Sequence, residues 1–203
     1  MQTLEQKREQ VVSPKVKLWT GEECDALVQN GLLKGRYELI EGMIIDKMGS
    51  GGRHALFVSV LMALLMRLFG GERVRVQLPI RILGELGHHN EPEPDLAVTQ
   101  KRHRAYPEHP LTEDLLLVAE VSDSSLRYDL AVKARLYAQT GIPEYWVIDT
   151  DGESLILHRE PTSEGYQQVT TLKVTDSLSP LSVPAISFAL SELFAGDEAE
   201  EVK

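Results

Sequence analysis

Residues 115–121 read LLLVAEV, and this stretch decides the fold because so continuous an apolar run is typical of a strand buried on both faces. Glu120 is the one charged residue within it. Burying an ionised carboxylate without a partner is costly, so Glu120 needs a cation, a hydrogen-bond network or a proton. The sequence on both sides of this strand offers candidates for all three.

The surrounding elements predict a single α/β domain. Helices are expected over 21–30, 54–69 and 129–140. Strands are expected over 73–83, 94–99, 115–122, 144–149 and 155–159, with a hairpin over 36–48, short C-terminal strands and a final helix near 190–194. Because the order from 54 to 149 is helix, three strands, helix, strand, we expect a mixed sheet flanked by helices.

Two of these helices carry more specific expectations. Thr20 and Glu23 have the spacing of a capping box, so the first helix should begin after Thr20. The helix over 54–69 is apolar nearly all round, and we expect it to be buried.

Length and composition limit the class of protein. The 203 residues suffice for one core, which we place at 18–195, between a flexible arm at 1–17 and an acidic tail at 196–203. The net charge of −10 argues against broad nucleic-acid affinity but leaves a local basic patch open. A single cysteine, no signal-peptide pattern and no apolar stretch judged long enough for a bilayer predict a cytoplasmic protein without a membrane association.

Two carboxylates are expected at one rim of the sheet. Asp95 opens one strand and Glu120 lies near the end of the next. Two such charges about 4 Å apart repel by roughly 4 kcal/mol at an effective dielectric of 20, so they must share a proton or bind a cation. Hard oxygen ligands favour Mg²⁺ or Mn²⁺.

The helix that follows supplies a lysine. Asp129, Lys133 and Tyr137 are spaced i, i+4, i+8 and share one face. If that face packs on the sheet, Lys133 can extend its ammonium to the two carboxylates. A lysine beside two carboxylates and a metal ion suits phosphodiester hydrolysis, because the metal polarises the phosphate while the lysine orients water or stabilises charge.

Several strings of the sequence together resemble one family. They are Arg36–Gly42, Pro94-Asp95, Glu120-Val-Ser122, Asp129–Tyr137, Gly141–Asp149 and the closing 180–194 segment, with His54 at the start of the apolar helix. In these residues the chain resembles the Uma-two family, which belongs to the PD-(D/E)XK nuclease superfamily. The resemblance covers about residues 18–195, and the string from Glu120 to Asp149 is its most specific part.

The resemblance implies a restriction endonuclease-like core with one divalent-metal site for Mg²⁺ or Mn²⁺. Asp95, Glu120 and the backbone carbonyl of Val121 would be its ligands, and Lys133 would assist the attacking water. Ser122 stands where the superfamily pattern has its lysine, which in this family has moved to the following helix. The additional candidates for the site are Glu38, His54, Ser122 and Tyr137.

Two hypotheses for function follow from these residues. The first is an endonuclease that cuts DNA, expected as a homodimer because cutting two strands needs two sites. The second is a non-catalytic regulatory or scaffold module on the same fold, with Glu120 neutralised by Lys133 or Arg127 and no metal ion. The basic run at 101–104 fits either a DNA contact or an exposed loop.

Overall fold

The computed structural model of the chain describes residues 15–47 and 51–194. Most of the expected flexible arm at 1–17 and all of the expected acidic tail at 196–203 lie outside these residues. Within them, the central feature is a mixed sheet of six strands in the order β3-β4-β5-β6-β7-β8. The strands are β3 (Val74–Val76), β4 (Leu96–Thr99), β5 (Leu115–Ser122), β6 (Glu144–Asp149), β7 (Ser154–Thr162) and β8 (Gly165–Lys173).

The pairing within this sheet explains why it is mixed. β5 and β6 run parallel, while every other neighbouring pair is antiparallel. A parallel pair needs a long crossover, and here a helical segment provides it. That segment comprises α4 (Leu126–Tyr128), the π-helical turn η4 (Asp129–Lys133) and α5 (Ala134–Gln139).

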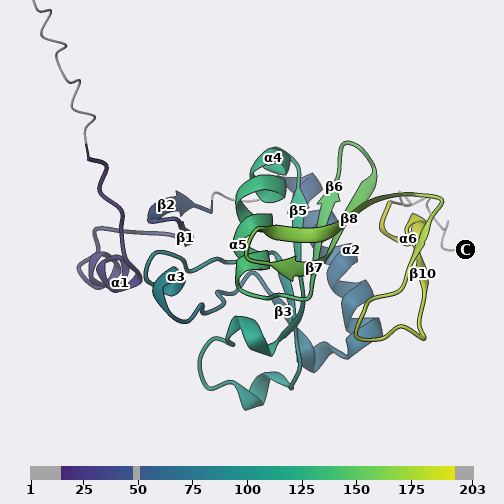
Figure 1. The fold of residues 1–203 in the computed structure, drawn as a ribbon, viewed down its shortest axis with the longest axis horizontal. Helices are drawn as coiled ribbons and strands as arrows, with labels where there is room; N and C mark the ends of the chain where they lie inside the picture. The colour runs from purple at the N-terminus through teal and green to yellow at the C-terminus, as the bar shows by residue number, and fades with distance from the viewer. Residues whose placement is uncertain (1–14, 48–50, 195–203) are drawn as a thin grey trace, which may run out of the picture.

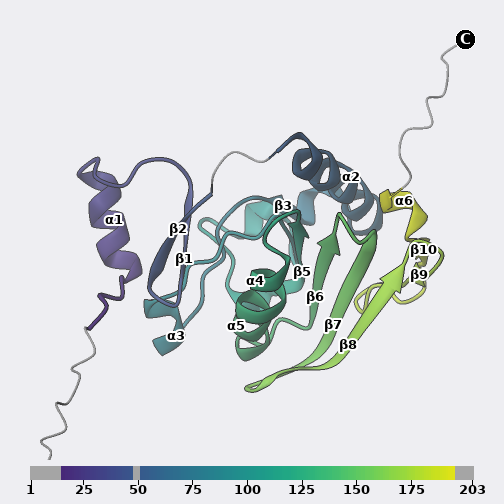
Figure 2. The same ribbon diagram turned by 90° about the horizontal axis from the view of Figure 1, so that it is seen from above.

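Helices cover both faces of the sheet, as the two ribbon views show (Figures 1 and 2). On one face lies α2 (Gly52–Phe69), whose inner residues join Leu117, Val121 and Trp146 in one apolar cluster. On the other face α5 packs against β7 and β8, and its Tyr137 joins Val118 and Tyr145 in a second cluster. β5 is therefore buried from both sides, and its burial confirms the expectation for residues 115–121.

The remaining elements lie at the two ends of the sheet. At one end are α1 (Gly21–Gln29), the hairpin of β1 (Tyr37–Ile40) and β2 (Met43–Asp46), and α3 (Glu85–His88). At the other end are β9 (Ser177–Leu178), β10 (Phe188–Ala189) and α6 (Ser191–Phe194). Short 3₁₀ turns η1, η2 and η3 span Gly71–Arg73, His103–Ala105 and Thr112–Asp114.

Local sequence signals placed several of these elements correctly. Thr20 and Glu23 form the expected capping box at the start of α1. β1 and β2 form the expected hairpin, whose turn holds Glu41 at φ +50° and Gly42 at φ +75°. Two consecutive left-handed residues match the type I′ turns that fit the twist of a hairpin.

Two expectations were wrong. The strand expected over 73–83 shrinks to Val74–Val76, because Gln77 turns to φ +49° and Pro79 cannot donate to a ladder. α2 is not buried all round: Val58, Leu61, Leu64, Leu65 and Leu68 face the core while Leu56 is 57% exposed.

α2 is also longer than its apolar sequence stretch suggested. It has 18 residues and a mean hydropathy of 1.5, so among the described residues it is the one helix that meets the length and composition needed to cross a membrane. This is weak evidence, because a helix that packs one face on a sheet can pass the same test. Here the inner face of α2 contacts β3, β4 and β5.

Candidate active site

The first two carboxylates meet where β4 begins and β5 ends. The antiparallel register places Leu96 beside Ala119, so Asp95 and Glu120 are the next residues to face each other. The Val121 N–H donates to Asp95 Oδ2 at 2.9 Å, which fixes the Asp95 carboxylate against the β5 backbone. The strand ends thus bring the two carboxylates together, as the sequence suggested.

Glu120 has one satisfied oxygen and one free oxygen. Its Oε1 accepts hydrogen bonds from Lys133 Nζ at 2.9 Å and from the Tyr137 hydroxyl at 2.9 Å. Its Oε2 has no hydrogen-bond partner among the described residues. This oxygen is not sealed from solvent. Although the residue is only 2% exposed, one carboxylate oxygen therefore remains open to a further ligand.

The crossover helix brings Lys133 to this rim through an irregular turn. We expected a regular helix from residue 129, but the helical segment begins at Leu126 and passes through a π-helical turn. A π turn is wider than an α turn and often occurs at functional sites. Asp129 and Lys133 are both buried at its ends, and their side-chain atoms lie 3.9 Å apart.

Asp129 has a positioning role in this turn. Its Oδ2 accepts hydrogen bonds from the Ser122 hydroxyl at 2.7 Å and the Ser125 hydroxyl at 2.5 Å. Ser122 thus ties the end of β5 to the turn that carries Lys133. The sequence predicted only that Asp129 shares a helix face with Lys133 and Tyr137.

Glu38 lies on the other side of Lys133. This residue of β1 is 3% exposed, and its Oε2 lies 3.1 Å from Lys133 Nζ and 3.9 Å from Lys47 Nζ. The same oxygen accepts the Glu93 N–H at 3.3 Å. The hairpin therefore contributes a third carboxylate to the lysine, which makes Glu38 part of the cluster.

His54 and Gln77 hold the second carboxylate. His54, in the first turn of α2, places Nε2 3.1 Å from Asp95 Oδ2, and its Nδ1 is buried without a partner in the described structure. The Gln77 amide lies 3.4 Å from Asp95 Oδ1 and accepts a hydrogen bond from Arg36 at 3.0 Å. No sequence pattern marked Gln77 or Lys47, since both reach the site through long-range contacts.

Burial and neighbouring charges move the pKa values of the two rim carboxylates apart. Burial alone would raise the pKa of Asp95, but the hydrogen bond from His54, the charge of Lys47 and the Val121 N–H bring it to about 2. Burial raises the pKa of Glu120 to about 7, against the opposing charges of Lys133 and Lys47. Asp95 is thus the permanent anion of the pair, and Glu120 is the group that responds to an added cation.

The same carboxylates raise the pKa values of Lys133 and His54. Burial opposes the charge of Lys133, but Glu120, Glu38 and Asp129 together raise its pKa and keep it protonated. The Asp95 hydrogen bond raises the pKa of His54 against the effect of burial. The cluster still holds more carboxylates than lysines, so its local charge is negative.

The donor set fits a hard divalent cation. Asp95 and Glu120 offer carboxylate oxygens, and the Val121 carbonyl should face the same side of β5 as its N–H, which points to Asp95. Among the described residues, no three His, Cys, Asp or Glu side chains are grouped as ligands of one ion. A metal here would therefore rest on two carboxylates, a backbone carbonyl and water.

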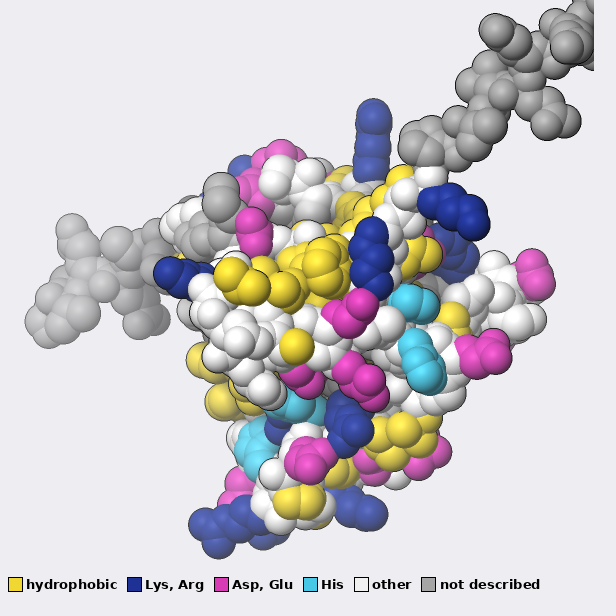
Figure 3. Space-filling view, turned by 90° about the vertical axis from the view of Figure 1, so that its left-hand side faces the viewer, with side chains coloured by type: hydrophobic (Ala, Val, Ile, Leu, Met, Phe, Trp, Pro, Cys, Tyr) yellow, Lys and Arg dark blue, Asp and Glu magenta, His cyan; other side chains and the backbone are white. Residues whose placement is uncertain are grey.

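The other sequence candidates lie away from this cluster. Arg127 is exposed and makes no ion pair with Glu120 in the described structure, so Lys133 is the partner of that carboxylate. The basic run at 101–104 is largely exposed, and Arg102 pairs with Glu72 at 3.0 Å. On the face that carries α1 and the β1–β2 hairpin, basic, acidic and histidine side chains are intermixed rather than gathered in one basic patch (Figure 3).

Comparisons with known proteins agree with this fold. A solved structure of a putative nuclease belonging to DUF820 from Anabaena variabilis has a TM-score of 0.65 and 16% sequence identity, and the match covers 83% of this chain and 97% of that one. No curated protein matches the chain. The family model named Uma2, described as "Putative restriction endonuclease", matches residues 31–191. The chain therefore belongs to the Uma2 family.

Proposed function

We propose that this protein is a metal-dependent endonuclease that hydrolyses phosphodiester bonds in DNA. The observation that carries the proposal is the buried contact of 2.9 Å between Lys133 Nζ and Glu120 Oε1, beside an Asp95 carboxylate fixed by the β5 backbone. An ammonium held next to two carboxylates at a strand rim combines a cation site with a hydrogen-bond donor for water or phosphate.

Lys133 has a donor available for this task. An ammonium has three N–H groups, and two of them can serve Glu120 and Glu38 at 2.9 and 3.1 Å. The third faces Asp129 at 3.9 Å, which is longer than a hydrogen bond. We assign this third donor to the attacking water or to the developing charge on phosphorus.

The remaining side chains position the ligands. Tyr137 fixes Oε1 of Glu120, and His54 with the Val121 N–H fixes Oδ2 of Asp95. Asp95, Glu120 and the Val121 carbonyl would hold the cation. When bound, Mg²⁺ would polarise a phosphate oxygen and lower the pKa of its water.

Cleavage of supercoiled plasmid in Mg²⁺ tests the proposal. The wild-type protein should convert the plasmid to nicked or linear forms, and Lys133→Ala should not. Lys173→Ala removes an exposed lysine at the end of the edge strand β8, outside the cluster, and should cleave as the wild type does. Equal cleavage by wild type and Lys133→Ala, or none by the wild type across several metals and DNA forms, would remove the support.

A second variant separates chemistry from folding. Lys133→Ala leaves three carboxylates facing one another, so a folding defect could hide the catalytic effect. Asp95→Asn keeps the shape of the side chain, removes its negative charge and retains one oxygen that can accept from the Val121 N–H. It should fold, as judged by circular dichroism, and should also lose cleavage.

A homodimer, which we propose for cutting both strands, would appear in light scattering.

The non-catalytic module remains the second candidate, because one specific observation favours it. Lys133 already neutralises Glu120, so this carboxylate does not require a metal ion for its charge to be compensated. Thermal unfolding in increasing Mn²⁺ distinguishes the two. A metal site raises the midpoint with the logarithm of free metal above its dissociation constant. No shift up to millimolar Mn²⁺ would favour the scaffold.

A further inference from the structure

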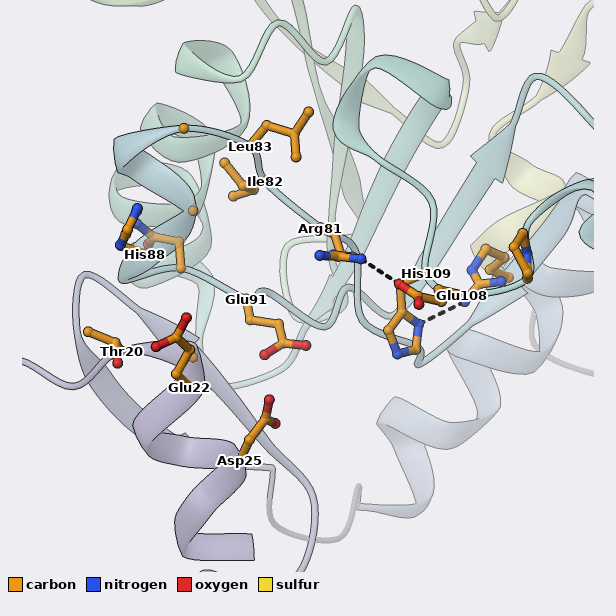
Figure 4. A pocket seen from close by; sticks show the side chains of 16 residues that line it. Thr20, Glu22, Asp25, Arg81, Ile82, Leu83, His88, Glu91, Glu108 and His109 are labelled. Atoms are coloured by element: carbon orange, nitrogen blue, oxygen red, sulfur yellow. Dashed lines mark hydrogen bonds and ion pairs between the residues drawn. The ribbon is translucent and has the colours of Figure 1, made fainter. Parts of the chain in front are cut away.

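A cleft of about 920 Å³ lies outside the carboxylate–lysine cluster, which consists of Asp95, Glu120, Glu38, Asp129 and Lys133. Its walls come from the first turn of α1, from the segment 81–91 around α3, from the loop 107–109, and from Arg75 on β3 (Figure 4). This volume is within the range of roughly 300–1,000 Å³ that small ligands occupy in proteins. The charged groups on its walls indicate what it can bind.

Arg75 is the most unusual group in the cleft. Its side chain belongs to a residue that is 8% exposed, its Nη2 lies 3.3 Å from His109 Nδ1, and its Nε has no partner in the described structure. No carboxylate among residues 15–47 and 51–194 forms an ion pair with it. A guanidinium does not lose its proton in proteins, and a buried charge without a counter-ion is unfavourable. An anionic ligand is therefore the missing partner.

His109 adds a second donor to the same wall. A guanidinium can only donate, so the contact with Arg75 requires an unprotonated Nδ1 on His109 and leaves its proton on Nε2. Burial and the charges of Arg75 and Arg81 lower the pKa of His109, which keeps this ring neutral. Arg81, which pairs with Glu108 at 2.5 Å and is half exposed, also lines the cleft (Figure 4).

The opposite wall limits the ligand to one anionic group on the arginine side. Glu22, Asp25 and Glu91 line that wall (Figure 4). Burial, and then the neighbouring Asp25, raise the pKa of Glu91. These carboxylates would repel a phosphate on their own side of the cleft, so we expect the phosphate to lie against the arginine wall.

The position of Arg75 connects the cleft to the carboxylate rim. Arg75 pairs with Ala97 on β4, and Gln77 follows two residues later, with its N–H still bonded to the Asp95 carbonyl at 2.9 Å. Two residues of extended chain span about 6.6 Å. The Gln77 side chain contacts Asp95 Oδ1, so β3 carries Arg75 of the cleft and, two residues later, a contact of the carboxylate rim.

We propose that Arg75, together with His109, binds a backbone phosphate of the nucleic-acid substrate, next to the phosphodiester that Asp95, Glu120 and Lys133 would hydrolyse. This assignment rests on the proposed function for the identity of the ligand. The phosphate site itself rests on the unpaired buried guanidinium and on the cleft that it lines.

Two probes test the site without metal: inorganic phosphate, followed by thermal unfolding, and a single-stranded DNA dodecamer, followed by fluorescence anisotropy. Both should bind the wild type. Arg75→Gln should weaken phosphate binding by about ten-fold or more, as expected for the loss of a charge-assisted hydrogen bond. It should also reduce the slope of log K against log salt for the dodecamer by about one.

Matched variants keep the result interpretable. Arg67→Gln makes the same charge change on the exposed outer side of α2 and should leave both affinities unchanged. If circular dichroism shows that Arg75→Gln does not fold, the exposed Arg81→Gln replaces it and should weaken both probes in the same direction. Equal binding by wild type and the folded cleft variant, an equal loss in Arg67→Gln, or no binding by the wild type would overturn the phosphate site.

The outcomes also separate this inference from the nuclease proposal. Arg75-dependent phosphate binding in a protein that cleaves no nucleic acid would support the site and reject the nuclease. Cleavage by a protein whose binding does not depend on the cleft variant would reject the site and leave the nuclease proposal intact.

Discussion

Glu120 and Glu144 are both buried carboxylates on neighbouring parallel strands, and they differ in how their oxygens are used. Glu144 is 0% exposed, and its Oε1 accepts from Trp146 Nε1 at 3.0 Å and from Arg159 Nη2 at 2.8 Å. Its Oε2 accepts the Leu181 N–H at 2.7 Å. Glu120, in contrast, has partners on Oε1 alone within the described structure.

The difference separates a carboxylate that stabilises the fold from one that is available to a ligand. Glu144 ties β6 to β7 through Arg159 and to the segment between β9 and β10 through Leu181. Both oxygens have donors and the side chain is fully buried, so Glu144 is not available to a ligand. Glu120 keeps an open oxygen at the strand rim, beside a second carboxylate. Of these two carboxylates, Glu120 is therefore the one available to a ligand.

The largest expected effect is on cleavage. Glu120→Gln should lower the cleavage rate by about 10³-fold, because a neutral amide holds a divalent cation poorly and gives less electrostatic stabilisation. Glu144→Gln should leave the rate per folded molecule unchanged. Initial rates of plasmid cleavage, scaled to the folded fraction from circular dichroism, measure both. Similar losses in the two variants would erase the contrast between these carboxylates.

The sequence alone predicted the part of this site that depends on local signals. The apolar run around Glu120, the strand 144–149 and the spacing of Asp129, Lys133 and Tyr137 were sufficient to place three elements and to bring Lys133 to Glu120. Strand and helix periodicities are properties of neighbouring residues, so they can be read without the fold.

The parts that were missed depend on contacts between distant segments. Gln77 reaches Asp95 because the chain leaves the strand after Val76 through a left-handed residue, which the alternating pattern of 73–83 concealed. Glu144 was placed in a strand, but its pairing with Arg159 and Leu181 was not foreseen. The one-sided burial of α2 was also missed, since an all-apolar helix carries no periodicity that shows which face meets the sheet.

The second effect is on folding stability. Here Glu144→Gln should be more damaging than Glu120→Gln. Glu144→Gln should lower the free energy of unfolding by about 3 kcal/mol, because it leaves the Arg159 guanidinium unpaired and turns an amide N–H₂ toward a donor. Glu120→Gln should cost less than about 1 kcal/mol, since Lys133 keeps Glu38 and Asp129 as counter-ions. Urea unfolding measures both, and a larger loss in Glu120→Gln would contradict the assignment.

The third effect is the response of stability to metal. At a free Mn²⁺ concentration of 100 times the dissociation constant, the wild type should gain about 2.7 kcal/mol. Glu144→Gln should gain the same unfolding free energy from Mn²⁺, although its stability without metal is lower. Glu120→Gln should lose most of this gain. Thermal unfolding at several Mn²⁺ concentrations measures the increments. An undiminished increment in Glu120→Gln would place the ion elsewhere.

The smallest expected effect is the pH dependence of stability at the Glu144 end of the sheet. His158 lies opposite Tyr145 in the β6–β7 register, is 4% exposed, and has a buried Nδ1 without a partner in the described structure. Its ring faces those of Tyr145 and Tyr166 at centroid distances of 5.2 and 5.6 Å. Burial raises the pKa of both tyrosines, so neither loses a proton near neutral pH.

Burial lowers the pKa of His158 from its ordinary value near 6.5, so the unfolded chain takes up this proton before the folded one does. The stabilisation by the neutral ring is complete above pH 6.5 and is lost as the pH falls below that value. His158→Phe keeps the ring packing and removes the titration, so its loss of unfolding free energy between pH 7 and pH 5 should be smaller than that of the wild type by about 1 kcal/mol. Urea unfolding at the two pH values measures this. Equal losses in the two proteins would show that His158 does not account for the acid sensitivity between pH 7 and pH 5.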